Sequence, residues 1–151
     1  MAHKRIANID PWIPMDKRID FPPRKPELRK PLYWLMPDGD DLFFVNATNL
    51  VLDEVSATTG GYSTDYDPPE PFTTGEGYKY IEVMPNEAVK IDHINLALES
   101  DAVIQDEIIV KTHNQETLVF RVYIDKKGSR EIVLLWDNLD VGKDVRLIDN
   151  D

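Results

Sequence analysis

The chain has 151 residues, of which 42% are hydrophobic and 30% are charged, a composition typical of one globular domain and unlike that of a disordered or membrane protein. It contains no cysteine, which excludes a disulfide framework, a thiolate zinc site, an iron–sulfur cluster and a cysteine nucleophile. The net charge of −11 opposes binding of the protein to nucleic acid.

No apolar stretch approaches the roughly 20 residues that span a bilayer. The basic residues at the start of the chain are not followed by an apolar segment of the kind found in a signal peptide. We therefore expect a soluble, cytoplasmic protein that contacts neither membrane nor nucleic acid. We also expect it to use no cofactor.

Residues 1–31 differ in charge from the rest of the chain. They hold eight Lys or Arg and four Asp or Glu, a net charge of +4, whereas residues 32–151 hold nine basic and twenty-four acidic residues, a net charge of −15. Six of the eleven prolines also lie in residues 1–31, and proline at this density disfavours helices and removes backbone donors. The pattern predicts an extended, Pro-rich basic arm over residues 1–31 and one domain over residues 32–151.

Two interpretations of the arm remain open. It is either a solvated tail or a segment that docks, folding onto its own domain or reaching a neighbouring copy. Docking is favoured by five large apolar residues, which are too many for a simple spacer: Trp12, Ile13, Met15, Ile19 and Phe21. Residues 23–26 contain a PxxP core but lack the flanking basic residue that proline-recognition modules require.

From Asp41 onward, apolar residues recur with a period of two, which predicts strands. Residues 117–124 show the alternation most clearly. We predict that they form a hairpin with residues 129–136 through a turn at residues 125–128, and that residues 107–112 precede them in a meander with a turn at residues 113–116. The other predicted strands are residues 42–47 paired with 50–58, and residues 78–83 and 87–92 around a turn at 84–86.

Two segments are harder to assign. Residues 94–109 fit either a helix or a strand followed by a loop. We favour the strand and loop; a helix there would change the class to α+β. Residues 145–148 form either a last edge strand or a loose end. In total, about seven or eight short, regularly spaced strands favour an antiparallel β-sandwich or a barrel.

Residues 43–55 resemble the opening hairpin of many immunoglobulin-like and fibronectin-like sandwiches, in which an Asn-containing turn precedes a strand across the core. Residues 82–89 are similar to a recurrent strand–turn–strand piece of these domains, with Asn86 at the usual glycine position; asparagine also tolerates that conformation. The resemblance covers residues 40–136, without the two cysteines around a tryptophan that mark antibody domains. It implies an all-β, immunoglobulin-like sandwich and implies no activity.

Motifs that would indicate chemistry are few. The sequence has neither GxSxG nor GxxxxGK[ST]. His93 and His113 would form a metal site only if the fold brought them together, and we expect one surface and one turn histidine instead. Residues 38–41 resemble a fragment of a calcium loop without its closing glutamate, so we expect a solvated turn. Asn46 begins a glycosylation sequon but is explained by its turn.

Residues 59–77 form the longest predicted loop and contain four of the seven glycines. Tyrosine, glycine and acidic residues on a rigid sheet are typical of binding loops. The alternative is a long hairpin whose aromatic residues cover the edge of the sandwich. The candidate binding residues are Tyr62, Asp65, Tyr66, Asp67, Glu70, Phe72 and Tyr78.

The leading hypothesis for function is a non-catalytic β-sandwich that binds another protein through the 59–80 loop, the arm or both. Its acidity suits a basic partner, as in an immunity or accessory protein that masks a basic active site. One alternative is a carbohydrate or small-ligand module in which the loop aromatics form a stacking platform. Another is a structural homo-oligomer with exchanged arms. For an enzyme built on an acid pair such as Asp65 and Glu82, the spacing gives no support.

Overall fold

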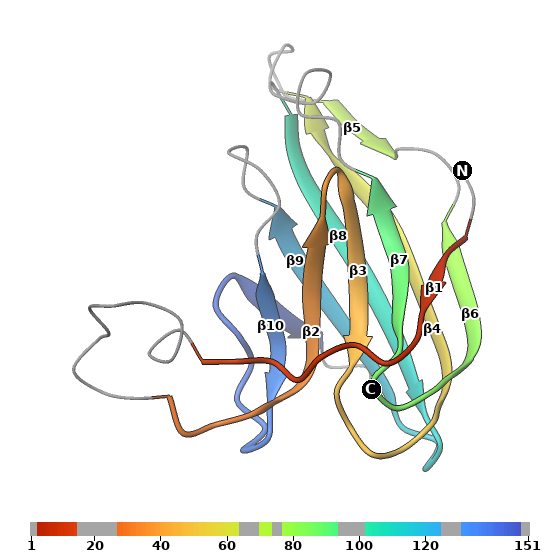
Figure 1. The fold of residues 1–151 in the computed structure, drawn as a ribbon. Helices are drawn as coiled ribbons and strands as arrows, with labels where there is room; N and C mark the ends of the chain where they lie inside the picture. The colour runs from red at the N-terminus through yellow and green to blue at the C-terminus, as the bar shows by residue number, and fades with distance from the viewer. Residues whose placement is uncertain are drawn as a thin grey trace.

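The computed structural model describes residues 3–14, 27–63, 70–73, 77–93, 102–124 and 131–148; for residues 60–63, 70–73 and 102–104 it describes the backbone alone. The described residues form strands and turns, and none of them is helical. The strands make two antiparallel sheets, so the protein belongs to the all-β class (Figure 1). Within these same residues there is no helix long and apolar enough to cross a bilayer.

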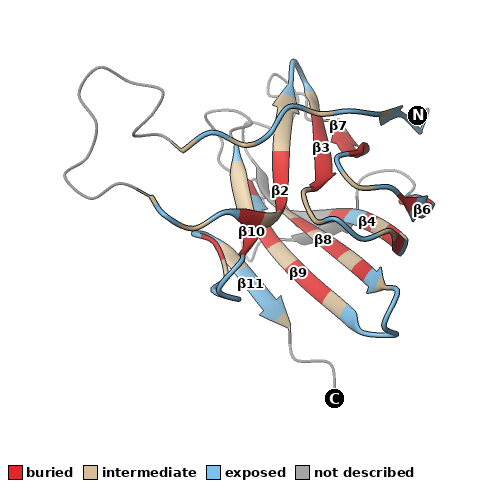
Figure 2. Ribbon diagram, turned by 60° about the horizontal axis from the view of Figure 1, so that its bottom comes forward, coloured by how far each residue is buried: buried red, intermediate tan, exposed pale blue. Residues whose placement is uncertain are grey.

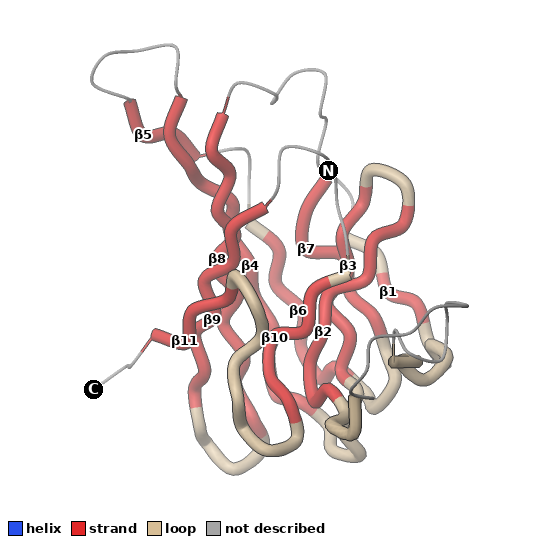
Figure 3. Tube along the Cα trace, turned by 90° about the vertical axis from the view of Figure 1, so that its left-hand side faces the viewer, coloured by secondary structure: helices blue, strands red, loops and turns tan. Residues whose placement is uncertain are grey.

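The first sheet, sheet A, has the spatial strand order β1 (Arg5–Ile6), β7 (Ala88–His93), β3 (Asp41–Asn46), β2 (Pro31–Asp38) and β10 (Ile132–Trp136). The second sheet, sheet B, has the order β11 (Val145–Ile148), β9 (Thr117–Ile124), β8 (Ala102–Thr112), β4 (Leu52–Ser63) and β5 (Glu70–Thr73), and β6 (Tyr78–Val83) also pairs with β4. Viewed from the side, β8, β9 and β11 lie apart from β1, β2 and β3 (Figure 3).

The main hydrophobic core lies between the two sheets, as in a β-sandwich. Leu35 and Phe44 from sheet A join Val55, Ile108 and Phe120 from sheet B in one buried cluster. All five side chains are fully buried, so the inward-facing positions of both sheets form a continuous apolar layer. Figure 2 shows buried positions recurring along β2, β3, β8 and β9.

The two sheets differ in how their strands are buried. In sheet B, buried and less buried residues alternate along β6 and β9, which is the pattern of a sheet that faces solvent on one side. In sheet A, β3 is buried from Leu42 to Asn46 and β7 from Ala88 to Asp92, without alternation. Such continuous burial requires cover on both faces of sheet A.

Two of the predicted strand pairings are wrong. Residues 117–124 lie in sheet B beside β8 and β11, whereas residues 132–136 lie in sheet A beside β2, so they form no hairpin. Likewise β3 belongs to sheet A and β4 to sheet B, so residues 42–47 and 50–58 do not pair. In both cases the chain crosses between the sheets. Alternation alone does not distinguish a crossing from a hairpin, because either sheet can bury the apolar face of a strand.

Other expectations hold. The hairpin through residues 113–116 is confirmed, with Lys111 opposite Thr117. Asn86 lies in the turn between β6 and β7 at φ 61°, the left-handed conformation expected of it. Residues 145–148 form a strand at the edge of sheet B. The described residues contain eleven strands instead of seven or eight, because β1, β2 and β5 were not predicted.

Two long segments differ from expectation. The predicted 59–77 loop is partly strand, because β4 continues to Ser63 beside β8 and Glu70–Thr73 forms β5. In the ambiguous segment 94–109, strand begins at Ala102, earlier than the predicted residue 107, and no described residue of it is helical. Residues 94–101 lie outside the described residues.

Candidate functional site

Part of the outer face of sheet A is apolar. On β2, Tyr33 and Leu35 join the core between the sheets, so the alternate residue Trp34 points to the opposite face. The same alternation places Phe43 and Val45 of β3 outward. Together with Ala88 of β7, these outward residues form a second buried cluster, against which Met36, Ala47 and Val133 pack. We call this surface the sheet A groove.

The cover of the sheet A groove is the chain's own N-terminal segment, residues 3–14. Ile6, Ile9 and Trp12 pack against the second cluster. In Figure 1 this segment runs across the front of β3 and β2 towards β10. Sheet A therefore has a layer on each face, which explains the continuous burial of its strands.

One end of the segment is anchored by main-chain pairing with the edge of β7. Arg5 lies opposite Val89, and Ile6 lies opposite Ala88. The amide of Lys90 donates to the carbonyl of Lys4 at 2.9 Å, and beyond the strand the amide of Ile9 donates to the carbonyl of Asn86 at 2.8 Å. The short strand β1 thus adds to the edge of sheet A as a bound peptide would.

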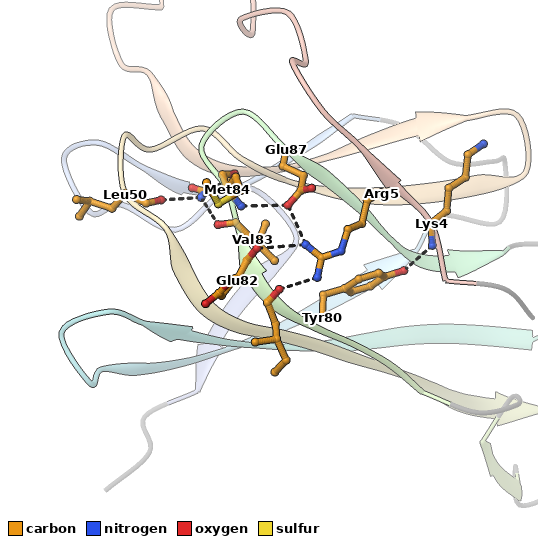
Figure 4. A network of polar contacts seen from close by, with 10 residues as sticks. Lys4, Arg5, Leu50, Tyr80, Glu82, Val83, Met84 and Glu87 are labelled. Atoms are coloured by element: carbon orange, nitrogen blue, oxygen red, sulfur yellow. Dashed lines mark hydrogen bonds and ion pairs between the residues drawn. The ribbon is translucent and has the colours of Figure 1, made fainter.

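Arg5 fixes this end with its guanidinium group. Its Nη2 donates to the carbonyl of Ile81 at 2.6 Å, and its Nη1 donates to the carbonyl of Glu82 at 3.2 Å and to Oε1 of Glu87 at 3.1 Å. Figure 4 shows the side chain reaching from β1 to the turn between β6 and β7. A planar fork with several donors suits such a set of acceptors better than a lysine does.

Tyrosine and histidine rings support the same end. The Tyr80 hydroxyl donates to the carbonyl of Lys90 at 2.6 Å and accepts a bond from the amide of Lys4 at 3.1 Å. Burial raises the pKa of Tyr80, so the hydroxyl keeps its proton and can donate. The ring of His3 lies 5.2 Å from that of Tyr78 and 5.1 Å from that of Tyr80.

The other end is anchored by Trp12. Its ring meets the ring of Trp136 edge-on, with 5.3 Å between centroids, and its Nε1 donates to Oε1 of Glu131 at 2.5 Å. The guanidinium of Arg29 lies 4.2 Å from the centroid of the Trp136 ring. An indole held by ring contacts and one hydrogen bond is the type of anchor found at protein–protein hot spots.

The N-terminal segment does not fill the groove completely. A hollow of about 440 Å³ lies between residues 6–13 and the sheet, where Trp34, Met36 and Glu131 form its wall. A second hollow of about 360 Å³ borders Trp12 and is lined by both Pro14 and Glu27. The groove therefore has room beyond what the segment occupies.

A polar cluster lies near the end of β7. Oδ1 of Asp41 is 2.7 Å from Nδ1 of His93 and 3.3 Å from Nζ of Lys90. The hydrogen bond from His93, with help from Lys90, lowers the pKa of Asp41. Among the described residues, no group of three or more His, Asp or Glu is placed to hold a metal ion. We therefore assign this cluster to the stability of the sheet end.

The residues predicted from the long loop are placed only in part. Asp65, Tyr66 and Asp67 lie outside the described residues, and Tyr62, Glu70 and Phe72 are placed by their backbones in β4 and β5. Tyr78 is buried, with 5% of its surface exposed, and packs in the core between the sheets. Whether the other six bind a ligand remains a prediction.

The histidines and the sequon have structural roles. His93 contacts Asp41 at the start of β3, whereas His113 lies 3.3 Å from Asp53 beside the β8–β9 turn, at the other end of the sheets. Asn46 is fully buried and its side chain organises the following turn. The turn at residues 38–41 joins β2 to β3, with Gly39 at φ 61°.

The number of apolar residues in the arm, Trp12 among them, predicts a segment that docks, but the sequence alone does not reveal the groove that receives Trp12. A signal was present in the unbroken apolar run from Leu42 to Val45, because a strand exposed on one face would alternate. Comparison of the chain with known protein families, with curated proteins and with solved structures found no match.

Proposed function

We propose that this chain is a non-catalytic, immunoglobulin-like β-sandwich that binds another protein by taking an extended segment of it across the sheet A groove. The observation that supports the proposal is the N-terminal segment itself, which lies in the groove as a peptide ligand would. It uses main-chain pairing at a sheet edge, an arginine fork and an aromatic anchor. These are recurrent means of peptide recognition.

The order of strand pairing supports the immunoglobulin-like class. Strands β2, β3 and β7 are neighbours in one sheet, and β6, β4, β8 and β9 are neighbours in the other. This is the order of strands A, B and E opposite C′, C, F and G in immunoglobulin-like and fibronectin-like domains. Strand β1 takes the position beside β7 that strand D takes in constant-type domains.

Charge indicates the chemistry of the bound segment. The occupant presents Lys4 and Arg5 at one end and Trp12 at the other. Residues 32–151 have a net charge of −15. A basic segment with a large aromatic residue therefore fits the groove, and its association should weaken as salt is raised. An immunity or accessory protein that masks a basic active site would bind its partner in this way.

A carbohydrate-binding platform has less support. Such a site needs exposed, coplanar aromatic rings. Tyr78 is the one ring of the predicted platform whose side chain is described, and it is buried between the sheets. We therefore favour a protein segment over a sugar.

The test uses a fluorescent peptide with the sequence of residues 3–14 and a full-length variant whose own segment is detached by Arg5→Ala and Ile6→Asp. We expect the peptide to bind this variant in a salt-sensitive way, measured by fluorescence anisotropy. A matched variant also contains Ala88→Phe, whose larger side chain would occupy the groove. This variant should not bind the peptide. Absence of binding to the first variant at about 1 mM peptide, the effective concentration typical of a short tether, would contradict the proposal.

A further inference from the structure

We propose that the partner is a second copy of this chain, so that two copies exchange residues 3–14 and each segment lies in the sheet A groove of the other. This inference rests on the proposed function and names its partner.

The contacts of the N-terminal segment do not depend on chain continuity. The side-chain hydrogen bonds that hold Lys4, Arg5 and Trp12 join residues 76 to 119 positions apart in the sequence. The acceptors lie in β6, in the turn between β6 and β7, and at Glu131 immediately before β10. A second copy offers the same groove, so its acceptors can form the same bonds with the segment of the first.

The segment is also easily released. Its strand β1 has two residues, and Pro11 and Pro14 have no amide with which to extend the pairing. The side chain of Arg5 is 39% exposed, so its ion pair with Glu87 is accessible to water and salt. A short, partly solvated element of this type opens at lower free energy than the core.

Two hollows border the N-terminal segment. The hollow of about 440 Å³ lies along residues 6–13, beside Trp34 and Met36, and the hollow of about 360 Å³ lies beside Trp12, where Pro14 and Glu27 both line it. The segment is therefore packed less closely than a core strand, which lowers the free energy needed to exchange it.

Length and charge permit the exchange. Twelve residues separate Pro14 from Glu27, and a chain of that length reaches at most roughly 40 Å. The basic arm is attracted to the acidic domain of either copy. A tethered segment competes at an effective concentration of about 1 mM, so exchanged dimers should become prominent near that protein concentration.

The experiment mixes two full-length single-cysteine variants, Ile6→Cys and Ala88→Cys, which carry tags of different mass. Ile6 and Ala88 are directly opposite in the β1–β7 register, and opposite residues lie within disulfide range. The natural chain has no cysteine to interfere. At about 1 mM protein under mild oxidation, we expect a mixed disulfide dimer. The matched control pairs Ile6→Cys with Thr117→Cys at the exposed β8–β9 hairpin and should give far less.

A chain that carries both Ile6→Cys and Ala88→Cys separates the two proposals. A disulfide within the chain at about 10 μM and between chains at about 1 mM supports exchange. Closure within the chain at both concentrations, with no mixed dimer above the control, overturns the exchange and leaves the groove as a binding site. No disulfide in either arrangement overturns both the exchange and the proposed function.

Light scattering on the unmodified protein tests the exchange without depending on whether the cysteine variants fold. We expect the mass to rise from 17.4 kDa towards twice that value between about 10 μM and about 1 mM, and Ile6→Asp to suppress the rise. A constant mass, or an equal rise in Ile6→Asp, overturns the exchange.

Discussion

Asn46 shows how much of this fold depends on one side chain. Its Nδ2 donates to the carbonyls of Leu50, Val83 and Met84 at 2.8, 3.2 and 3.3 Å. Its Oδ1 accepts bonds from the amide and the hydroxyl of Thr48. The side chain therefore ties the crossing from β3 to β4 to the end of β6.

We expect Asn46→Ala to lower the free energy of unfolding by about 2–3 kcal/mol, because the buried carbonyl of Val83 and the partly buried carbonyls of Leu50 and Met84 lose this donor. Asn46→Asp should cost more at pH 7, since a carboxylate would then face three carbonyl oxygens. That extra loss should shrink as pH falls and the new carboxyl is protonated. Urea unfolding of both variants, with exposed Asn49→Ala as control, checks this; equal losses in all three would contradict it.

Asp41 should give a stability that depends on pH. Its pKa is lowered below the ordinary value of 3.8 by the hydrogen bond from His93 and by Lys90. A lowered pKa means that the contribution is complete above the unfolded-state value and is lost as pH falls through the folded-state value. Asp41→Asn should therefore destabilise the protein at pH 6 and have a smaller effect at pH 2.5.

The control for this prediction is Asp40→Asn at the neighbouring exposed position. Urea unfolding at both pH values gives the comparison. A loss of equal size at pH 6 and pH 2.5 would show that the carboxylate charge of Asp41 contributes nothing.

At the scale of elements, β1 is held chiefly by Arg5. Arg5→Ala should release the strand and expose the amide of Lys90, which donates to the carbonyl of Lys4. We expect hydrogen exchange at Lys90 to accelerate by about tenfold, equivalent to roughly 1.4 kcal/mol. Arg5→Lys should accelerate it nearly as much, because an ammonium group cannot reproduce the fork. Arg146→Ala, at an exposed arginine on β11, should leave it unchanged.

The strands were largely predictable from sequence, but their partners were not. Alternation located residues 117–124 and 78–83, because the period of two is a local property. Local turn chemistry favours hairpins, but the connections β3–β4, β6–β7 and β9–β10 each cross between the sheets. The burial patterns separate the two sheets. Burial alternates along β9, which belongs to sheet B, and is continuous along most of β3 and β7, which belong to sheet A. Strand β2 was not predicted, because it precedes Asp41, where the clear alternation begins; Pro31 and Pro37 near its ends are also unusual in strands.

The candidate site was predictable only in outline. The charge contrast and the apolar residues of the arm indicated a segment able to dock. The groove itself combines Trp34 and Phe43 of the β2–β3 hairpin with Ala88 of β7, a strand that is distant in sequence. No local pattern reports which faces of separate strands meet, so this surface appears only once the sheet is assembled.

At the scale of the whole molecule, the residues that the structure describes form three layers: sheet B, sheet A and the N-terminal segment. The central layer is buried on both faces, so exposure of its outer face would uncover Trp34, Phe43 and Val45 together. We expect the Arg5→Ala and Ile6→Asp double variant to bind a dye for exposed apolar surface, whereas exposed Leu139→Asp, distant from β1 in the sequence, should not. Equal dye binding by the two would contradict the three-layer arrangement.

The most direct measurement is a set of nuclear Overhauser effects between the N-terminal segment and sheet A in the full-length protein. Contacts of Ile6 with Ala88 and of the Trp12 ring with the Trp136 ring are expected, since these pairs are register partners and ring neighbours. Mixing labelled with unlabelled protein would then assign them to one chain or two. Random-coil shifts for residues 3–14, without contacts to the sheet, would contradict the account.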